Sequence, residues 1–253
     1  MGDLLVVGSV ALDSVETPFG KVREALGGSA TYFSYSASFF TQVRLVAAVG
    51  EDFPEAHLRL LADRGVDITG LQTSKGRTFR WAGQYSYDLN EAKTLDTMNF
   101  WIQGKQEALR RVLAEVDVVT INDGEARQLA SEPNLIRAAR AIAGLGPRTV
   151  VVKRGEYGAL MLTDGAFFFV PAYPLESVYD PTGAGDTFAG GFMGYLAAQE
   201  RVDAAAMRRA LAYGSVMASF TVEDFSLKRL TRLKPADIAD RYAAFYDLIR
   251  LEP

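Results

Sequence analysis

Short apolar runs alternate with amphipathic stretches along most of this chain. LLVVG at 4–8 and VRLVAAVG at 43–50 have the length and composition of β-strands. The stretches at 53–64 and 135–143 space their apolar residues as helices do. Further strands are predicted at 68–72, 117–122, 149–155, 159–163 and 167–172, and further helices at 105–116, from Asp186, from Asp203 and at 235–251. This alternation predicts an α/β protein built in layers.

Two strand patterns differ from each other. VVTI at 118–121 and VVV at 150–152 show little alternation, which indicates strands buried on both faces of a parallel sheet. RTFRWAGQYSY at 77–87 alternates aromatic and polar residues, as a half-exposed antiparallel strand or hairpin does. We therefore predict one α/β domain over 1–253 with a small β lid at 72–90, since no repeat or linker interrupts the chain.

The charge and amino-acid composition of the chain disfavour several classes of function. The 253 residues carry a net charge of -4, which disfavours nucleic acid as the partner. There is no cysteine, and the one histidine, His57, falls within a predicted amphipathic helix, so thiolate and Ser-His-Asp catalysis are disfavoured. The first residues resemble neither a signal peptide nor a membrane span, and we expect a cytoplasmic protein with no membrane partner.

The segment DPTGAGDTFAGG at 180–191 is the strongest candidate site. Gly183, Ala184 and Gly185 let the backbone approach a ligand, and a helix that begins near Asp186 would point its free N–H groups at the same place. A carboxylate beside an anion site suits phosphoryl transfer, in which it accepts the proton of the attacking hydroxyl. The alternative is that Asp186 is only a helix cap, and Asp180 and the glycines only a turn.

The same segment resembles the second signature of the PfkB/ribokinase family of sugar and nucleoside kinases. Three other segments agree in type and in order: Asp13 after the first strand, LGGSATYFS at 26–34, and NDGE at 122–125. The resemblance implies a ribokinase-like three-layer α/β sandwich with a mostly parallel central sheet and a small β lid. It also implies ATP-dependent phosphorylation of a hydroxymethyl group on a nucleoside or sugar.

By this resemblance Asp186 is the catalytic base and Gly183, Ala184 and Gly185 form the anion hole. Glu125 and Asn122 would organise hydrated Mg²⁺, which needs only one or two carboxylates beside a nucleotide, although a helix cap is the commoner role of such a motif. Potassium at Asp180 is implied by the resemblance alone. The predicted nucleotide-binding residues are Asn122, Lys153, Arg154, Gly155, Thr182, Gly183, Gly185, Tyr213 and Val216.

The predicted substrate site combines a carboxylate, small residues and aromatic rings. Its residues are Asp13, Gly27, Gly28, Ser29, Tyr32, Phe79 and Trp81. Asp13 would accept hydrogen bonds from paired hydroxyls. Tyr32 stands where many relatives have an asparagine, and with Phe79 and Trp81 it would suit stacking on a base, core packing being the alternative for such rings.

The second departure from the family lies at about 95–96. Relatives place a strand, a helix and another strand between YDLNEAKTL and DTMNFW, a unit of roughly 30 residues or more. Either a segment is absent from this sequence, or central strands have been lost and activity with them. The alternatives are thus an active kinase and a catalytically impaired protein that binds nucleotide or sugar. A homodimer through the lid is a further expectation.

Two other nucleotide-binding classes are disfavoured by their motifs. VVGSVALDS after the first strand lacks the GxGxxG of dinucleotide-binding folds, and no GxxxxGK[ST] occurs anywhere.

Overall fold

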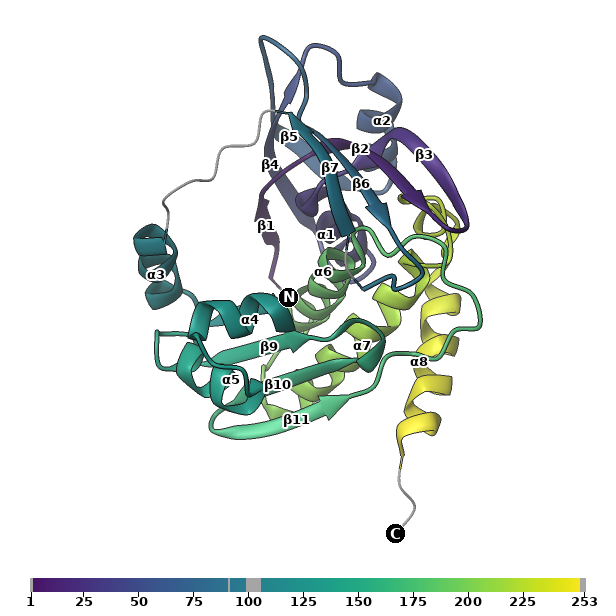
Figure 1. The fold of residues 1–253 in the computed structure, drawn as a ribbon. Helices are drawn as coiled ribbons and strands as arrows, with labels where there is room; N and C mark the ends of the chain where they lie inside the picture. The colour runs from purple at the N-terminus through teal and green to yellow at the C-terminus, as the bar shows by residue number, and fades with distance from the viewer. Residues whose placement is uncertain (1, 91, 99–105, 251–253) are drawn as a thin grey trace. The chain divides into compact units, whose positions relative to one another are not determined.

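The computed structural model describes residues 2–90, 92–98 and 106–250. The chain divides into two compact units: unit 1 comprises residues 1–100 and 173–253, and unit 2 comprises residues 101–172. Figure 1 shows the elements, and each unit is described by itself. Within the described ranges, no helix has both the length and the apolar character that crossing a bilayer requires.

Unit 1 contains a three-stranded parallel sheet in the order β1–β4–β5. Its strands are β1 (Leu4–Val7), β4 (Val43–Gly50) and β5 (Val66–Ser74). The helices α1 (Ser29–Ala37) and α2 (Glu55–Asp63) pack against these strands. Leu5 and Val7 nevertheless remain 66% and 73% exposed, and Val46, the register partner of Val7, is 37% exposed. Since parallel sheets are ordinarily covered on both faces, these three apolar side chains lack their expected cover within the described residues of unit 1.

A second sheet of unit 1 has the order β3–β2–β6–β7. Its strands are β2 (Ala11–Thr17), β3 (Gly20–Gly27), β6 (Arg80–Tyr85) and β7 (Ala92–Met98). β2 and β6 are parallel, whereas the β2–β3 and β6–β7 pairs are antiparallel, so the antiparallel pairing predicted for 77–87 is confirmed. β7 runs unbroken past the predicted deletion point, with a register shift that leaves Leu95 as a bulge.

Three long helices of unit 1 pack on one another: α6 (Ala184–Ala197), α7 (Ala204–Thr221) and α8 (Pro235–Ile249), with a short 3-10 turn at Leu230–Arg232. A side chain at Gly190 or Gly194 would strike α1, and one at Gly191 would strike α7. The face of α6 that carries these three glycines therefore lies against helices.

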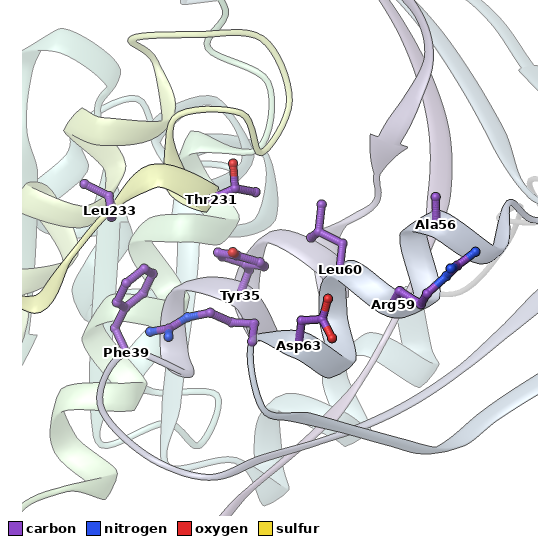
Figure 2. Close-up of a pocket in the computed structure, with 9 residues that line it drawn as sticks. Tyr35, Phe39, Ala56, Arg59, Leu60, Asp63, Thr231 and Leu233 are labelled. Atoms are coloured by element: carbon purple, nitrogen blue, oxygen red, sulfur yellow. The ribbon is translucent and has the colours of Figure 1, made fainter.

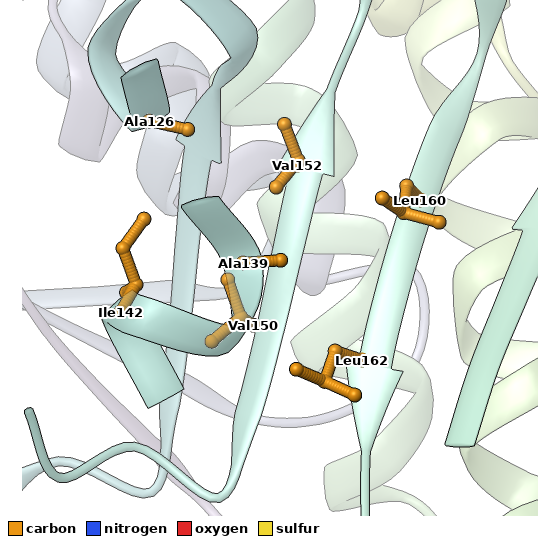
Figure 3. Close-up of a cluster of buried hydrophobic side chains, with 7 residues drawn as sticks. All are labelled: Ala126, Ala139, Ile142, Val150, Val152, Leu160 and Leu162. Atoms are coloured by element: carbon orange, nitrogen blue, oxygen red, sulfur yellow. The ribbon is translucent and has the colours of Figure 1, made fainter. Parts of the chain in front are cut away.

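Unit 2 is a four-stranded sheet in the order β11–β10–β9–β8 with helices. Its elements are α3 (Gln106–Glu115), β8 (Val118–Asn122), α4 (Asp123–Ala130), α5 (Leu135–Ala143), β9 (Thr149–Lys153), a 3-10 turn at Gly155–Tyr157, β10 (Ala159–Thr163) and β11 (Ala166–Val170). Val150 and Val152 project from β9 into a buried cluster with Ala126, Ala139 and Ile142 of α4 and α5 (Figure 3).

The two buried-strand predictions have different outcomes. Val150–Val152 are fully buried, as predicted, and β8 pairs in parallel with β9. Residues 118–121 of β8 are only half-buried, because β8 is an edge strand of this sheet. The extent of the domain, the lid at 72–90 and the deletion near 95–96 stay predictions.

Candidate functional site

The candidate anion site is the turn that begins α6. Gly183 is the N-cap and adopts a left-handed conformation with φ 77°. The N–H of Thr187 donates to the Gly183 carbonyl at 2.8 Å, and Asp186 occupies the third helical position. The alternative in which Asp186 is the cap is therefore wrong. Asp186 lies in the first turn, half-buried, where a helix dipole favours negative charge.

Gly183 lies directly against the ring of Tyr32, on α1. A side chain built at Gly183 would overlap that ring, so both the positive φ and the contact require glycine here. Tyr32 is 2% exposed, and the side chain of Ser226 acts on its hydroxyl. Burial raises the pKa of Tyr32 well above its usual value. The ring thus packs beneath the turn, and direct contact with a substrate stays a prediction.

The Asp180 carboxylate holds the segment that precedes Gly183 through hydrogen bonds. One carboxylate oxygen accepts the N–H of Thr182 at 2.9 Å, and the other accepts the N–H of Ser226 at 3.3 Å. Asp180 is only 1% exposed, and this burial raises its pKa. The turn role proposed from the sequence as an alternative is the role observed. Ser226 adopts a left-handed φ of 56°, and its hydrogen bond to Asp180 was not predicted.

Asp13 lies on β2 and faces the di-glycine segment. Its carboxylate accepts the N–H of Gly28 at 3.3 Å, while a side chain at Gly27 would overlap that carboxylate. Burial raises the pKa of Asp13 to about 7; the Gly28 hydrogen bond lowers it, and the charges of Asp180 and Asp186 raise it. Asp13, Asp180 and Asp186 therefore lie close enough to interact electrostatically.

Ser29, the next predicted substrate residue, is bonded to a neighbouring loop. Its N–H donates to the Ser9 hydroxyl at 3.1 Å, and the two hydroxyls are 3.0 Å apart. Ser29 thus fixes the start of α1 beside Gly28, whose φ of 91° is accessible to glycine at little cost.

The β6 strand places aromatic residues beside Asp13. Trp81 on β6 is the register partner of Asp13. Its indole ring lies over Gly83, and the indole N–H donates to the Thr94 hydroxyl at 3.3 Å. Alternation puts Tyr85 on the same face as Trp81. The Thr182 hydroxyl donates to the Tyr85 phenol at 3.3 Å. The sequence analysis missed Tyr85, although its spacing from Trp81 was a usable signal. Phe79, just before β6, is half-buried and accepts the Leu12 N–H through its carbonyl.

The remaining predicted nucleotide residues of unit 1 lie on α7. Tyr213 is stacked between Tyr195 and Tyr242, with ring centroids 4.6 Å and 4.1 Å away, so both of its faces are covered. Val216 is fully buried. Neither side chain offers a free surface to an adenine ring in this arrangement, and their roles stay predictions.

The predicted residues of unit 2 gather at the carboxyl ends of two parallel strands. Asn122 and Lys153 are register partners at the ends of β8 and β9. Asn122 and Glu125 form a capping box for α4: the Glu125 N–H donates to Asn122 at 2.7 Å, and the Asn122 N–H donates to Glu125 at 2.9 Å. The capping alternative is thus observed.

Arg154, which follows β9, lies near two aromatic rings. Its guanidinium carbon is 5.7 Å from the ring centre of Tyr157 and 5.6 Å from that of Phe169. Gly155 opens a short 3-10 turn with φ 52°. In the described ranges, no cluster of three or more acidic or histidine side chains is arranged to hold a metal. A magnesium ion here would rely on a single carboxylate, that of Glu125, together with water and nucleotide oxygens.

A separate pocket of about 710 Å³ in unit 1 contains none of these residues (Figure 2). It lies where α1, α2 and the segment before α8 meet. The Arg64 guanidinium within it stacks 3.7 Å from the ring centre of Phe39. The arginine thus serves the packing of α1 on its neighbours.

Comparison with known proteins identifies the family. Residues 92–230, more than half of the chain, match the pfkB family of carbohydrate kinases. The chain is similar to a cytidine kinase of Thermococcus kodakarensis, to which it is 31% identical over an alignment 246 residues long, gaps included. The alignment covers 76% of this chain and 88% of the cytidine kinase. This chain belongs to the pfkB family of carbohydrate kinases.

Solved structures agree with this membership. Aminoimidazole riboside kinase from Salmonella enterica, in complex with aminoimidazole riboside and an ATP analogue, has a TM-score of 0.79, 18% identity and coverage of 95% of this chain and 99% of the other. A ribokinase II-like protein of E. coli with ATP and Mg²⁺ has a TM-score of 0.78, 19% identity and coverage of 96% and 100%. The predicted ribokinase-like α/β fold is confirmed, as is the prediction of a kinase from a carbohydrate and nucleoside kinase family.

Replacing Asp13 by Asn should remove a pH dependence of stability. The raised pKa means that the folded protein binds a proton more tightly than the unfolded chain does, so Asp13 lowers stability as pH rises from about 4 to about 7. At pH 8, the free energy of unfolding of Asp13→Asn, measured with urea, should exceed that of the wild type by roughly 2–4 kcal/mol. This difference should vanish near pH 4. Asp240→Asn on exposed α8 is the control. An equal increase in the free energy of unfolding at pH 4 and at pH 8 would contradict the raised pKa of Asp13.

Replacing Gly183 by Ala should destabilise unit 1 more than the backbone conformation alone explains. Gly65 has a similar φ, 85°, with open space around it, so Gly65→Ala measures the conformational cost, roughly 1 kcal/mol. Gly183→Ala adds the overlap with the Tyr32 ring, for which about 1–3 kcal/mol more is expected. Urea unfolding of both variants checks this, and equal losses would show that the ring moves aside freely.

Proposed function

We propose that this protein transfers the γ-phosphoryl group of ATP to a hydroxymethyl group of a nucleoside or sugar, with Asp186 as the general base. One observation carries the proposal. Asp186 lies in the first turn of α6, directly after the left-handed Gly183, and close enough to Asp13 to raise the pKa of that carboxyl. The base is therefore beside both an anion-binding helix start and a carboxylate that suits hydroxyl groups.

The chemistry follows from this arrangement. The acceptor oxygen attacks the γ-phosphorus, the bond to the bridging oxygen of ADP breaks, and the hydroxyl proton passes to Asp186. The positive end of the α6 dipole, at the Gly183–Gly185 turn, stabilises the charge on the transferred phosphoryl group. A side chain at Gly183 would alter this turn, which explains why the position is glycine.

The acceptor lies in unit 1 in this proposal. Asp13 accepts hydrogen bonds from two neighbouring hydroxyls, and the Trp81 indole offers a flat apolar face on the same side of the sheet. The family relatives include a cytidine kinase and a riboside kinase, which supports a nucleoside or a related riboside as the acceptor class. Gly27, Gly28, Ser29, Tyr32 and Phe79 complete the proposed surroundings.

Residues of unit 2 serve the nucleotide in this proposal. The E. coli relative binds ATP with Mg²⁺, which supports the same pair here. Glu125 is exposed, and its carboxylate suits a hydrated Mg²⁺, with Asn122 holding it in position. In this proposal Lys153, Arg154 and Gly155 contact phosphates and Thr182 serves the nucleotide from unit 1, whereas Tyr213 and Val216 would do so only if their packing changed. Potassium at Asp180, a dimer through the lid and a cytoplasmic location also remain part of the proposal.

Replacing Asp186 by Asn tests the base. The amide cannot take the hydroxyl proton, so we expect ADP release with ATP, Mg²⁺ and a panel of nucleosides and pentoses to fall about 10²–10⁴-fold. The same substitution at Asp240 leaves the site untouched and should keep full activity. An Asp186→Asn variant that retains full activity would refute the assigned base.

We further infer that relatives contain a strand–helix–strand segment at the point that corresponds to residues 95–96, which this chain lacks. The cytidine kinase alignment extends over 246 residues, whereas 76% of 253 residues is about 192, so about 50 aligned positions have no counterpart here. The exposed Leu5 and Val7 on a parallel sheet are consistent with a missing cover. This observation favours the second candidate function, a protein that binds nucleotide or sugar with impaired catalysis.

Restoring the segment should stabilise the protein. A chimera that carries the corresponding cytidine kinase residues between Leu95 and Asp96 should have a higher Tm than one with a Gly-Ser insert of equal length, because the cytidine kinase segment covers apolar surface. The intact mass of the native protein shows whether the polypeptide is the 27.6 kDa species. Equal Tm values for the two inserts would contradict the missing cover.

A further inference from the structure

The start of the β6 strand is firmly anchored in unit 1. The Asp52 carboxylate accepts the Thr78 N–H at 2.7 Å and the Thr78 hydroxyl at 2.8 Å, and it pairs with Arg80 at 2.7 Å. Thr78 in turn accepts the Gly50 N–H at 3.0 Å. Together these bonds fix where β6 begins relative to β4.

The other end of β6 reaches the turn before α6. Tyr85 is the last residue of β6, and its phenol oxygen accepts the Thr182 hydroxyl at 3.3 Å. Asp13 and Trp81 are register partners on the same sheet, and alternation places Tyr85 on their face. Tyr85 therefore joins the Asp13-bearing sheet to the turn that contains Gly183.

The neighbours of this phenol are carboxylates. Asp180, Asp13 and Asp186 all act electrostatically on Tyr85, and burial, the largest effect, raises its pKa to about 12. The phenol consequently keeps its proton at any physiological pH. Because Thr182 is the donor in their hydrogen bond, the phenol retains its own hydrogen for a second partner.

A polyhydroxyl substrate needs both kinds of partner. An ionised carboxylate accepts hydrogen bonds but donates none, so a substrate ring oxygen, which only accepts, needs a donor from another group. We propose that Tyr85, oriented by Thr182, is a substrate-binding residue that donates its phenol hydrogen to an oxygen of the hydroxyl-bearing acceptor. This rests on the proposed kinase function and adds to it a residue that sets affinity for the acceptor.

Tyr85→Phe removes only the phenol oxygen and tests the proposal. Losing one neutral hydrogen bond should raise KM for the acceptor about 3- to 10-fold, with kcat and the KM for ATP changed less than about twofold. Tyr87→Phe is the matched control, because Tyr87 is two residues away and 85% exposed. Calorimetric binding of the acceptor without ATP should show the same loss of affinity for Tyr85→Phe.

Thr182→Val separates orientation from mere stability. If Thr182 acts through the phenol, its loss should raise KM less than Tyr85→Phe does, and the double variant should match Tyr85→Phe alone. Additive effects, or a Tyr85→Phe enzyme that behaves like Tyr87→Phe, would overturn the role of Tyr85 while leaving the kinase intact. A wild-type protein that neither phosphorylates nor binds any acceptor overturns the proposed function first, and the role of Tyr85 with it.

Discussion

The contact between Gly183 and the Tyr32 ring is the constraint on which the candidate site depends. It fixes the distance between the Gly183 turn and α1, and this turn determines where α6 begins and therefore where Asp186 lies. Ser226 extends the same support, since it donates its N–H to Asp180 at 3.3 Å and its hydroxyl to the Leu26 carbonyl at 2.6 Å. One buried ring and one buried serine thus couple the α6 turn to the di-glycine segment.

This support brings carboxylates together in a buried place, at an energetic cost. Asp13 and Asp180 both have raised pKa values because burial disfavours their charged forms. A fold built only for stability would avoid such a cluster, whereas a site that must bind hydroxyl groups beside a phosphoryl group needs hydrogen-bond acceptors there. The uncharged partners around the carboxylates are backbone N–H groups and hydroxyls, which hold the oxygens without adding further charge.

The sequence predicted local features well and long-range partners poorly. The bounds of α5 follow from apolar spacing at 135–143, and the glycine-rich turn was read correctly as the start of a helix. The β2–β3 hairpin and α1 were not predicted, because a short strand pair and a small-residue helix give weak periodic signals. The strand spacing of Tyr85 from Trp81 was a usable signal, but its hydrogen bond to Thr182, 97 residues away, could not be read from either segment.

The uncovered face of the β1–β4–β5 sheet shows how a local pattern can disagree with the fold around it. LLVV at 4–7 is the kind of run that forms a strand buried on both faces, yet every second residue is exposed. Local and global preferences normally agree in natural sequences, so a disagreement of this size points to an absent partner rather than to an unusual strand. Asp13, Asp180, Asp186 and Tyr85 rest on contacts within unit 1 that do not involve this face. The described site can therefore keep its internal arrangement even if the sheet has lost its cover.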